Sequence, residues 1–214
     1  MSARSVYITR RICLAGLAAG VAAPTWAQHA TTHHGPAHGS PPPGRDARDP
    51  LAGRFGGPFS LIDHTGKPVS DGDFRGRFML VYFGFTRCTD TCPVDLPTMA
   101  QALDGLGPLA QRVAPLFVTV DPAHDTPPVL AAYVAAFHPA LIGLTGSEAQ
   151  IAAVARAYKV HRRKLTQPHH GHGEYAVDHG SLTYLMDREG RFLTLLPHKT
   201  GADRMAAVLR GYLA

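Results

Sequence analysis

The sequence predicts a mixed α/β fold in which buried strands alternate with helices. Residues 78–85 and 114–120 are continuous apolar runs rich in β-branched and aromatic side chains, as in strands covered on both faces of a sheet. After each run, a proline near the start of the next segment marks the first turn of a helix. Near the C-terminus, the turn signal Arg188-Glu189-Gly190 separates two more apolar runs and predicts a β-hairpin.

Two helices are predicted after the two central strands. The first covers residues 93–106, where Pro93 stands in the first turn and its missing N–H costs no helical hydrogen bond. The second covers residues 126–137, with Thr126 as the N-terminal cap and Pro127 at the first helical position. Strands and helices therefore alternate along this part of the chain.

The C-terminal half continues the same pattern. A short strand is expected at residues 141–144, and Ser147 with Gln150 forms a capping box that opens a third helix. Residues 181–187 and 192–196 are the two strands of the predicted hairpin. A final helix is predicted from apolar residues at helical spacing, namely Met205, Val208, Leu209 and Tyr212. The whole order matches a thioredoxin-like α/β fold, a central mixed sheet flanked by helices with a β-hairpin near the C-terminus.

The first 50 residues are predicted to lie outside this fold. Residues 1–27 have the pattern of an export signal peptide, with a basic stretch ending in Arg10-Arg11, an apolar run and small residues near a cleavage point. The paired arginines also fit a twin-arginine signal. Residues 28–50 are rich in His and Pro and read as a disordered linker, which could also collect metal ions weakly. We expect residues 51–214 to form the folded domain, in the periplasm; an uncleaved signal would leave the protein membrane-associated.

Composition excludes two classes of protein. No apolar run approaches the ~18–20 residues of a spanning helix, which excludes a multipass membrane protein. The net charge of +5 falls to +2 when Arg4, Arg10 and Arg11 are left out, so no nucleic-acid partner is expected. The chain has 13 histidines and only 3 cysteines, a usage that points toward metal chemistry.

Cys88 and Cys92 form a CxxxC pair where the first central strand leads into a helix. Backbone N–H groups and the helix dipole at such a junction favour a thiolate over a thiol. A structural disulfide is one interpretation, but its short loop would remove little chain entropy. In a helical turn the two side chains lie on one face, ~5–6 Å apart at Cβ, and could grip one soft ion or close into a disulfide. Thiolates favour Cu(I), and an added imidazole extends such a site to Cu(II).

An ordered set of short motifs resembles the Sco/SenC family of exported, thioredoxin-fold copper proteins linked to cytochrome c oxidase assembly. The resemblance runs from about Phe59 to Leu213. Its motifs are Tyr82-Phe83-Gly84-Phe85-Thr86, then Cys88 and Cys92-Pro93, Thr119-Val120-Asp121-Pro122 with Asp125-Thr126, Gly143-Leu144-Thr145-Gly146, Val177-Asp178-His179 and Tyr184-Leu185-Met186-Asp187. Gly180, where the family usually has Ser or Thr, and the lack of a clear membrane anchor depart from the pattern.

The resemblance implies a copper site made by Cys88, Cys92 and His179, for Cu(I) and Cu(II). It also implies that Asp121 and Asp125 support the geometry of the site, although both could simply cap the helix that starts at Thr126. A second set of histidines (His169, His170 and His172) lies in a Gly/Pro-punctuated loop just before His179 and is expected to be solvated, with a secondary copper role left open.

The residues and the resemblance together lead to two functions. The resemblance implies the first, a periplasmic metallochaperone that delivers copper to the binuclear copper site of cytochrome c oxidase, with the copper-site subunit of the oxidase as its partner. The alternative is a thiol–disulfide oxidoreductase that uses Cys88 and Cys92 as a catalytic redox pair on that subunit or on another exported protein. Other periplasmic copper chaperones or thiol reductases would then be partners too. His179 separates the two, since a dithiol exchanger does not need it; whether the protein is an enzyme stays open.

Overall fold

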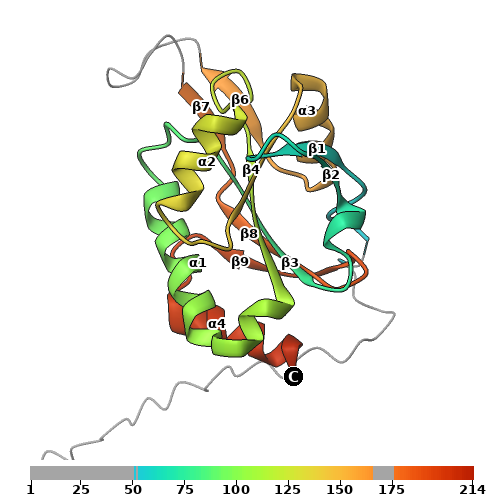
Figure 1. The fold of residues 1–214 in the computed structure, drawn as a ribbon, viewed down its shortest axis with the longest axis vertical. Coiled ribbons are helices and arrows are strands. Elements are labelled where there is room, and N and C mark those ends of the chain that lie inside the picture. The colour runs from blue at the N-terminus through green and yellow to red at the C-terminus, as the bar shows by residue number, and fades with distance from the viewer. Residues whose placement is uncertain (1–50, 52, 166–175) are drawn as a thin grey trace, which may run out of the picture. The chain divides into compact units, whose positions relative to one another are not determined.

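A seven-stranded mixed sheet is the centre of the computed structural model, which describes residues 51, 53–165 and 176–214 (Figure 1). Its strand order is β2-β1-β5-β4-β3-β8-β9, with β3, β4 and β5 parallel and the other neighbours antiparallel. The strands are β1 (Ser60–Asp63), β2 (Pro68–Ser70), β3 (Phe78–Gly84), β4 (Val113–Thr119), β5 (Ile142–Thr145), β8 (Leu182–Met186) and β9 (Phe192–Pro197). A separate two-stranded antiparallel sheet pairs β6 (Arg162–Leu165) with β7 (Ala176–His179).

Helices cover both faces of the seven-stranded sheet. They are α1 (Cys92–Leu106), α2 (Pro127–Ala135), α3 (Glu148–Ala157) and α4 (Ala202–Leu213), with short 3₁₀ helices η1 (Asp71–Phe74) and η2 (Gly107–Arg112). Buried side chains of α1, α2 and α4 form one hydrophobic core, and those of α3 and η1 belong to a second core on the opposite face. The arrangement is visible in Figure 1, where α1 and α3 lie on opposite sides of the strands.

The sequence of β3 explains why both cores are filled. All seven of its residues are buried, and successive side chains of a strand point to opposite faces. Leu80 and Tyr82 accordingly pack with α1, whereas Met79, Val81 and Phe83 pack with the α3 core. A strand buried on both faces needs a continuous apolar run, which is the pattern by which it was predicted.

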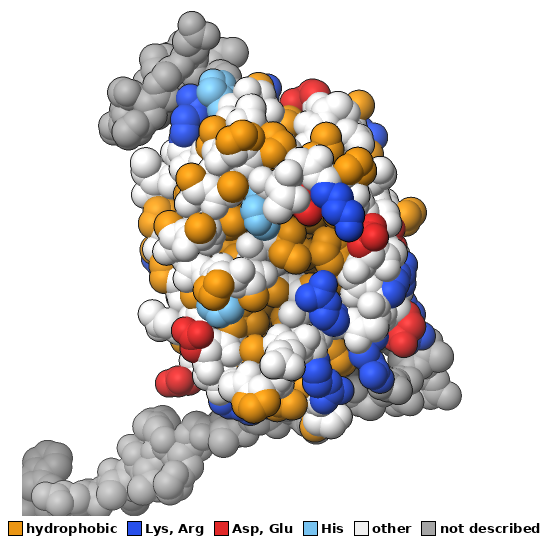
Figure 2. All heavy atoms as spheres, viewed as in Figure 1, with side chains coloured by type: hydrophobic (Ala, Val, Ile, Leu, Met, Phe, Trp, Pro, Cys, Tyr) orange, Lys and Arg blue, Asp and Glu red, His pale blue; other side chains and the backbone are white. Residues whose placement is uncertain are grey.

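The surface over α2 carries little charge. Its exposed side chains are Pro128, Val129, Ala132 and Ala135, and Figure 2 shows hydrophobic side chains gathered on this part of the face. Lys and Arg side chains gather instead toward the side where β1, β2 and η1 lie. None of the helices among the described residues is long and apolar enough to cross a bilayer.

The predicted fold class is confirmed, and so are the central strands, the four helices and the C-terminal hairpin. The pairs β1–β2 and β6–β7 were not predicted from the sequence. The strands β1 and β2 are four and three residues long, too short to show a period. The strand β6 reads Arg-Arg-Lys-Leu and has no apolar alternation. The proposed signal (1–27), the linker (28–50) and the His169, His170 and His172 loop lie outside the described residues.

Candidate metal centre

The two cysteines lie where β3 gives way to α1. The chain turns after Phe85, whose carbonyl accepts the Cys88 N–H at 3.1 Å, and α1 begins at Cys92 with Pro93 next. Cys92, the first residue of α1, is fully buried, while Cys88 on the preceding loop is only partly buried. Neither of them forms a disulfide. One cysteine is therefore held in the core and the other is partly accessible to solvent.

Gly84, the last residue of β3, makes room for the buried cysteine. A Cβ atom at this position would lie 2.6 Å from the Cys92 sulfur and 2.8 Å from the Phe117 ring. Both distances are shorter than any real contact of a Cβ atom, so a side chain here would displace the thiol. Glycine is needed at Gly84 for close approach and not for an unusual backbone angle.

His179 reaches the cysteines from the other sheet. It is the last residue of β7 and pairs in register with Arg162 of β6, whose guanidinium donates to the Val120 carbonyl and so fastens the two-stranded sheet to the end of β4. The His179 imidazole and the Phe85 ring form a T-shaped pair, with ring centroids 5.6 Å apart and planes at 86°. Its Nδ1 lies 3.0 Å from the Gly180 carbonyl oxygen. When Nδ1 carries the proton and donates it there, Nε2 is left as a ligand atom.

The three side chains form one donor set. Their ligand atoms all lie within 4.8 Å of one another, and no other group of three or more His, Cys, Asp or Glu side chains in the described part of the chain is so arranged. The donors are two soft sulfurs and one imidazole, which suits copper in preference to hard cations. A structural zinc site would ordinarily use a fourth protein ligand. The structure thus brings Cys88, Cys92 and His179 together; their role as ligands stays a prediction.

The two thiols share one proton in the metal-free protein. The pKa of Cys88 is lowered to about 3, chiefly by a hydrogen bond from the Cys92 side chain and also by the nearby His179 imidazole, against the opposing effect of burial. The same hydrogen bond, together with burial, raises the pKa of Cys92 far above its usual value. At neutral pH, therefore, Cys88 is the thiolate and Cys92 is the thiol that donates to it.

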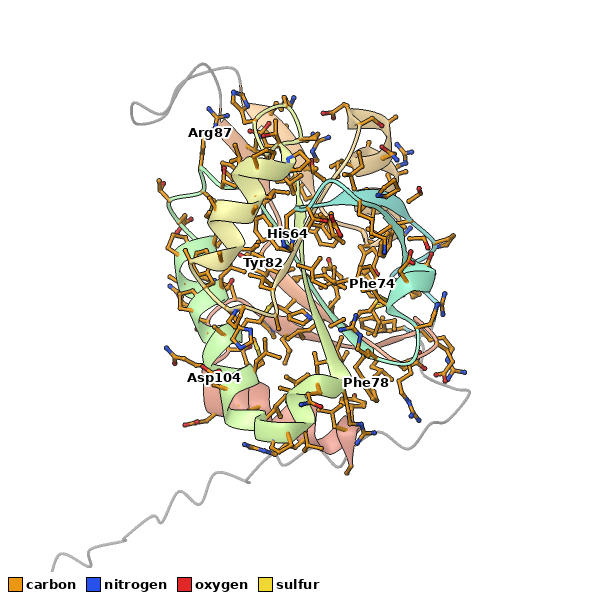
Figure 3. All side chains as sticks on the ribbon, viewed as in Figure 1. His64, Phe74, Phe78, Tyr82, Arg87 and Asp104 are labelled. Carbon is orange, nitrogen blue, oxygen red and sulfur yellow. The ribbon has the colours of Figure 1, made fainter. Side chains whose placement is uncertain are left out.

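Asp121 and Asp125 lie beneath the loop that carries Cys88 and outside the ligand group. Both side chains are fully buried. Asp125 accepts hydrogen bonds from the Thr86 N–H (3.1 Å), the Thr86 hydroxyl (2.6 Å) and the Thr119 hydroxyl (2.5 Å). Asp121 forms an ion pair with Arg87 at 3.0 Å, and Figure 3 shows Arg87 at the opposite end of β3 from Phe78. These contacts tie β4 to the loop before Cys88.

Sequence reasoning missed three residues next to the site, Tyr82, Asp95 and His198. The Tyr82 hydroxyl oxygen lies 3.9 Å from the Cys92 sulfur and 3.3 Å from the buried carboxylate of Asp95, which His198 contacts at 2.9 Å. Tyr82 reads as an ordinary core residue of β3, and Figure 3 places it inside the molecule. His198 is 103 residues away from Asp95, so no spacing could connect them.

Comparisons with known proteins place the whole folded part of the chain among related sequences and structures. A family model described as SCO1/SenC matches residues 47–214. Protein sco1 of Schizosaccharomyces pombe is 39% identical over 160 residues, which are 74% of this chain and 61% of that protein, so this chain spans less than two thirds of its length. The structure of Bradyrhizobium japonicum ScoI with copper bound has a TM-score of 0.68 and 40% identity, covering 74% of this chain and 99% of the other. BsSco, described as a member of the Sco family of cytochrome c oxidase assembly proteins with a disulfide switch, has a TM-score of 0.61 and 25% identity, covering 78% and 97%.

Proposed function

Since this chain belongs to the SCO1/SenC family, we propose that it binds one copper ion with Cys88, Cys92 and His179 and passes that ion to another protein. The observation that carries the proposal is the donor set itself, two sulfurs and an imidazole within 4.8 Å of one another. A related protein of the same fold, ScoI of Bradyrhizobium japonicum, has been solved with copper bound. Here copper is cargo, so both its capture and its release matter.

Capture of Cu(I) follows from the protonation of the pair. Cys88 meets the ion as a thiolate, and Cys92 then loses its proton to solvent as its sulfur bonds to the metal. One proton is therefore released for each Cu(I) bound by both sulfurs. Two thiolates can hold Cu(I), whereas Cu(II) prefers additional ligands that include nitrogen, which His179 provides.

Release is favoured by the exposure of one side of the site. Cys88 and His179 are only partly buried, so a ligand of an acceptor protein can reach the metal while Cys92 still holds it from below. We propose that the acceptor is the binuclear copper site of cytochrome c oxidase, in line with the description of BsSco as a member of a family of oxidase assembly proteins. We also place the mature protein in the periplasm, on the basis of the signal pattern in residues 1–27.

Thiol–disulfide exchange is a second candidate function, and the low pKa of Cys88 favours it. The partly exposed Cys88 thiolate could attack a partner's disulfide and release one partner thiolate. Cys92 would then displace the second partner sulfur, which leaves the partner reduced and the pair oxidised. This reaction uses no imidazole ligand, so His179 distinguishes the two functions.

Copper titration under reducing and non-reducing conditions tests the proposal. We expect His179→Ala to weaken Cu(II) binding by more than roughly tenfold, a loss that even an outer-shell partner of a metal site can cause. The same variant should keep Cu(I) at reduced affinity, and Cys88→Ser or Cys92→Ser should damage the binding of both ions. The matched control is His161→Ala. His161 is an exposed histidine just before β6, and it pairs with Asp178 of β7 outside the ligand group. If the reduced protein bound neither ion above background, copper delivery would be wrong and the exchange function would replace it.

A further inference from the structure

A buried carboxylate, Asp95, lies in the first turn of α1, which begins with the proposed ligand Cys92. It is 6% exposed. Three groups surround it: the Tyr82 hydroxyl at 3.3 Å, His198 Nδ1 at 2.9 Å and the Lys199 N–H at 3.2 Å. Burying a carboxylate is costly unless donors compensate it, and here they come from β3 and from the turn between β9 and α4.

The turn that supplies two of these donors adopts an unusual backbone conformation. Lys199 has φ +63°, in the left-handed region that side chains other than glycine and asparagine rarely occupy. In this conformation its N–H points at Asp95 Oδ1, while the His198 ring reaches Oδ2. The two oxygens of Asp95 therefore have different partners. Oδ1 accepts a hydrogen bond from the Lys199 N–H, and Oδ2 contacts His198 Nδ1 and the Tyr82 hydroxyl.

The Tyr82 hydroxyl has one proton and three neighbouring acceptors. They are Asp95 Oδ2 and the Thr91 hydroxyl oxygen, each at 3.3 Å, and the Cys92 sulfur at 3.9 Å. A carboxylate is the strongest acceptor of the three, since hydrogen bonds to an ionised group are about twice as strong as neutral ones. The proton of Tyr82 is thus directed to Asp95 and away from the sulfur.

We propose that Asp95 is a positioning residue that holds the Tyr82 hydroxyl proton, so that the Cys92 thiolate keeps its full donor strength for copper. The inference rests on the proposed copper-binding function and deepens it. Without the carboxylate, the Cys92 thiolate is the strongest acceptor left, because the Thr91 hydroxyl is uncharged, and the Tyr82 hydroxyl turns toward the sulfur. A thiolate that accepts a hydrogen bond gives less charge to a metal, and its thiolate-to-Cu(II) charge transfer needs more energy.

The substitution Asp95→Asn is suited to the test. Lys199 N–H keeps an oxygen at the Oδ1 position, so the new amide nitrogen takes the place of Oδ2 and donates to the Tyr82 oxygen. Tyr82 must then donate elsewhere. We expect the charge-transfer band of the Cu(II) protein to move to higher energy and lose intensity in Asp95→Asn, and to stay at the wild-type position in Tyr82→Phe and in the double variant, which have no hydroxyl proton to redirect.

Controls separate this effect from a general loosening of the site. His198→Ala removes one donor to Asp95 but leaves the acceptor of Tyr82 in place, so it should lower Tm without moving the band. The proposal would be overturned if the band shifted equally in Asp95→Asn with and without Tyr82→Phe. It would also be overturned if His198→Ala gave an equal shift, or if Asp95→Asn gave no shift at all. A shift to lower energy in Tyr82→Phe alone would overturn it too, a result that does not require Asp95→Asn to fold.

A metal-free measurement keeps the outcome distinct from failure of the copper function. In the infrared spectrum of the reduced full chain, the S–H stretch of Cys92 is assigned as the band that Cys92→Ser removes. We expect it to move to lower wavenumber in Asp95→Asn combined with Thr91→Val, where the Cys92 sulfur is the acceptor left to the Tyr82 proton. A sulfur that accepts a hydrogen bond is a stronger S–H donor, so the band should not move when Tyr82→Phe is added. If the S–H band moved in neither variant, the positioning role of Asp95 would be overturned even if the protein binds copper. If the band moved as expected but the protein bound no copper, only the proposed function would be overturned.

Discussion

Replacing Asp125 by alanine is expected to destabilise the protein by about 2–4 kcal/mol. The Thr119 hydroxyl and the Thr86 N–H would each lose their buried acceptor, at about 1–3 kcal/mol per unsatisfied donor. Release of a buried charge offsets part of this cost, because burial raises the pKa of Asp125 and so disfavours its ionised form. Asp125→Asn keeps one acceptor and the side-chain shape without the charge, so it should cost less than Asp125→Ala.

Urea unfolding followed by circular dichroism measures both changes. For a domain of this size the alanine variant should also lose roughly 5–15 °C in Tm. Asp104→Ala is the matched control, since its carboxylate is 75% exposed and its contact with His138 should be worth less than about 1 kcal/mol. A loss in Asp125→Ala no greater than that of the control would refute the view that this carboxylate holds β4 to the loop before Cys88.

Three further outcomes are expected, for the protonation of Asp125, the packing at Gly84 and the reactivity of Cys88. The stability of the wild type relative to Asp125→Asn should rise as the pH falls through the raised pKa of Asp125, since protonation removes the cost of the buried charge; a fall in denaturation titrations over that range would contradict the direction of the shift. Gly84→Ala should cost about 1–3 kcal/mol and weaken copper binding by displacing the Cys92 sulfur, whereas Gly211→Ala in α4, where a Cβ meets nothing within 4 Å, should cost nothing; equal melting temperatures for the two variants would argue against the crowding. Alkylation of Cys88 in the reduced protein, followed by peptide mapping, should be nearly independent of pH between about 5 and 8. It should become slower at the acidic end in Cys92→Ala, which lacks the hydrogen bond that chiefly lowers the pKa of Cys88, and a tenfold change in the wild-type rate per pH unit would show an ordinary thiol.

The sequence was informative wherever one local rule decides the structure. The strand β3 is a run of apolar residues buried on both faces, and Ser147 with Gln150 makes the predicted capping box at the beginning of α3. The CxxxC pair likewise depends on one strand–helix junction. In each case the residues that interact are near neighbours in the chain, so their types and spacing carry the information.

Contacts between distant segments could not be predicted in this way. Asp95 meets His198 across 103 residues, and nothing in either neighbourhood marks the pair. The strand β6 is polar, and its pairing with β7 comes from hydrogen bonds between backbones, which every residue type can make. The motif resemblance identified His179, but only the folded chain shows the Phe85 ring and the Gly180 carbonyl that orient its imidazole.

The donor set is divided between two sheets, since the cysteines follow β3 of the seven-stranded sheet, on the loop and the first residue of α1, whereas His179 belongs to the pair β6–β7. A two-stranded sheet is only marginally stable on its own. A copper ion held by all three side chains would act as a cross-link between the two sheets, and part of its binding free energy would appear as slower opening of the smaller one. Amide hydrogen exchange in β6 and β7 would then report the loading of the site. An acceptor ligand that displaced the imidazole would restore fast exchange there while the sulfurs still held the ion.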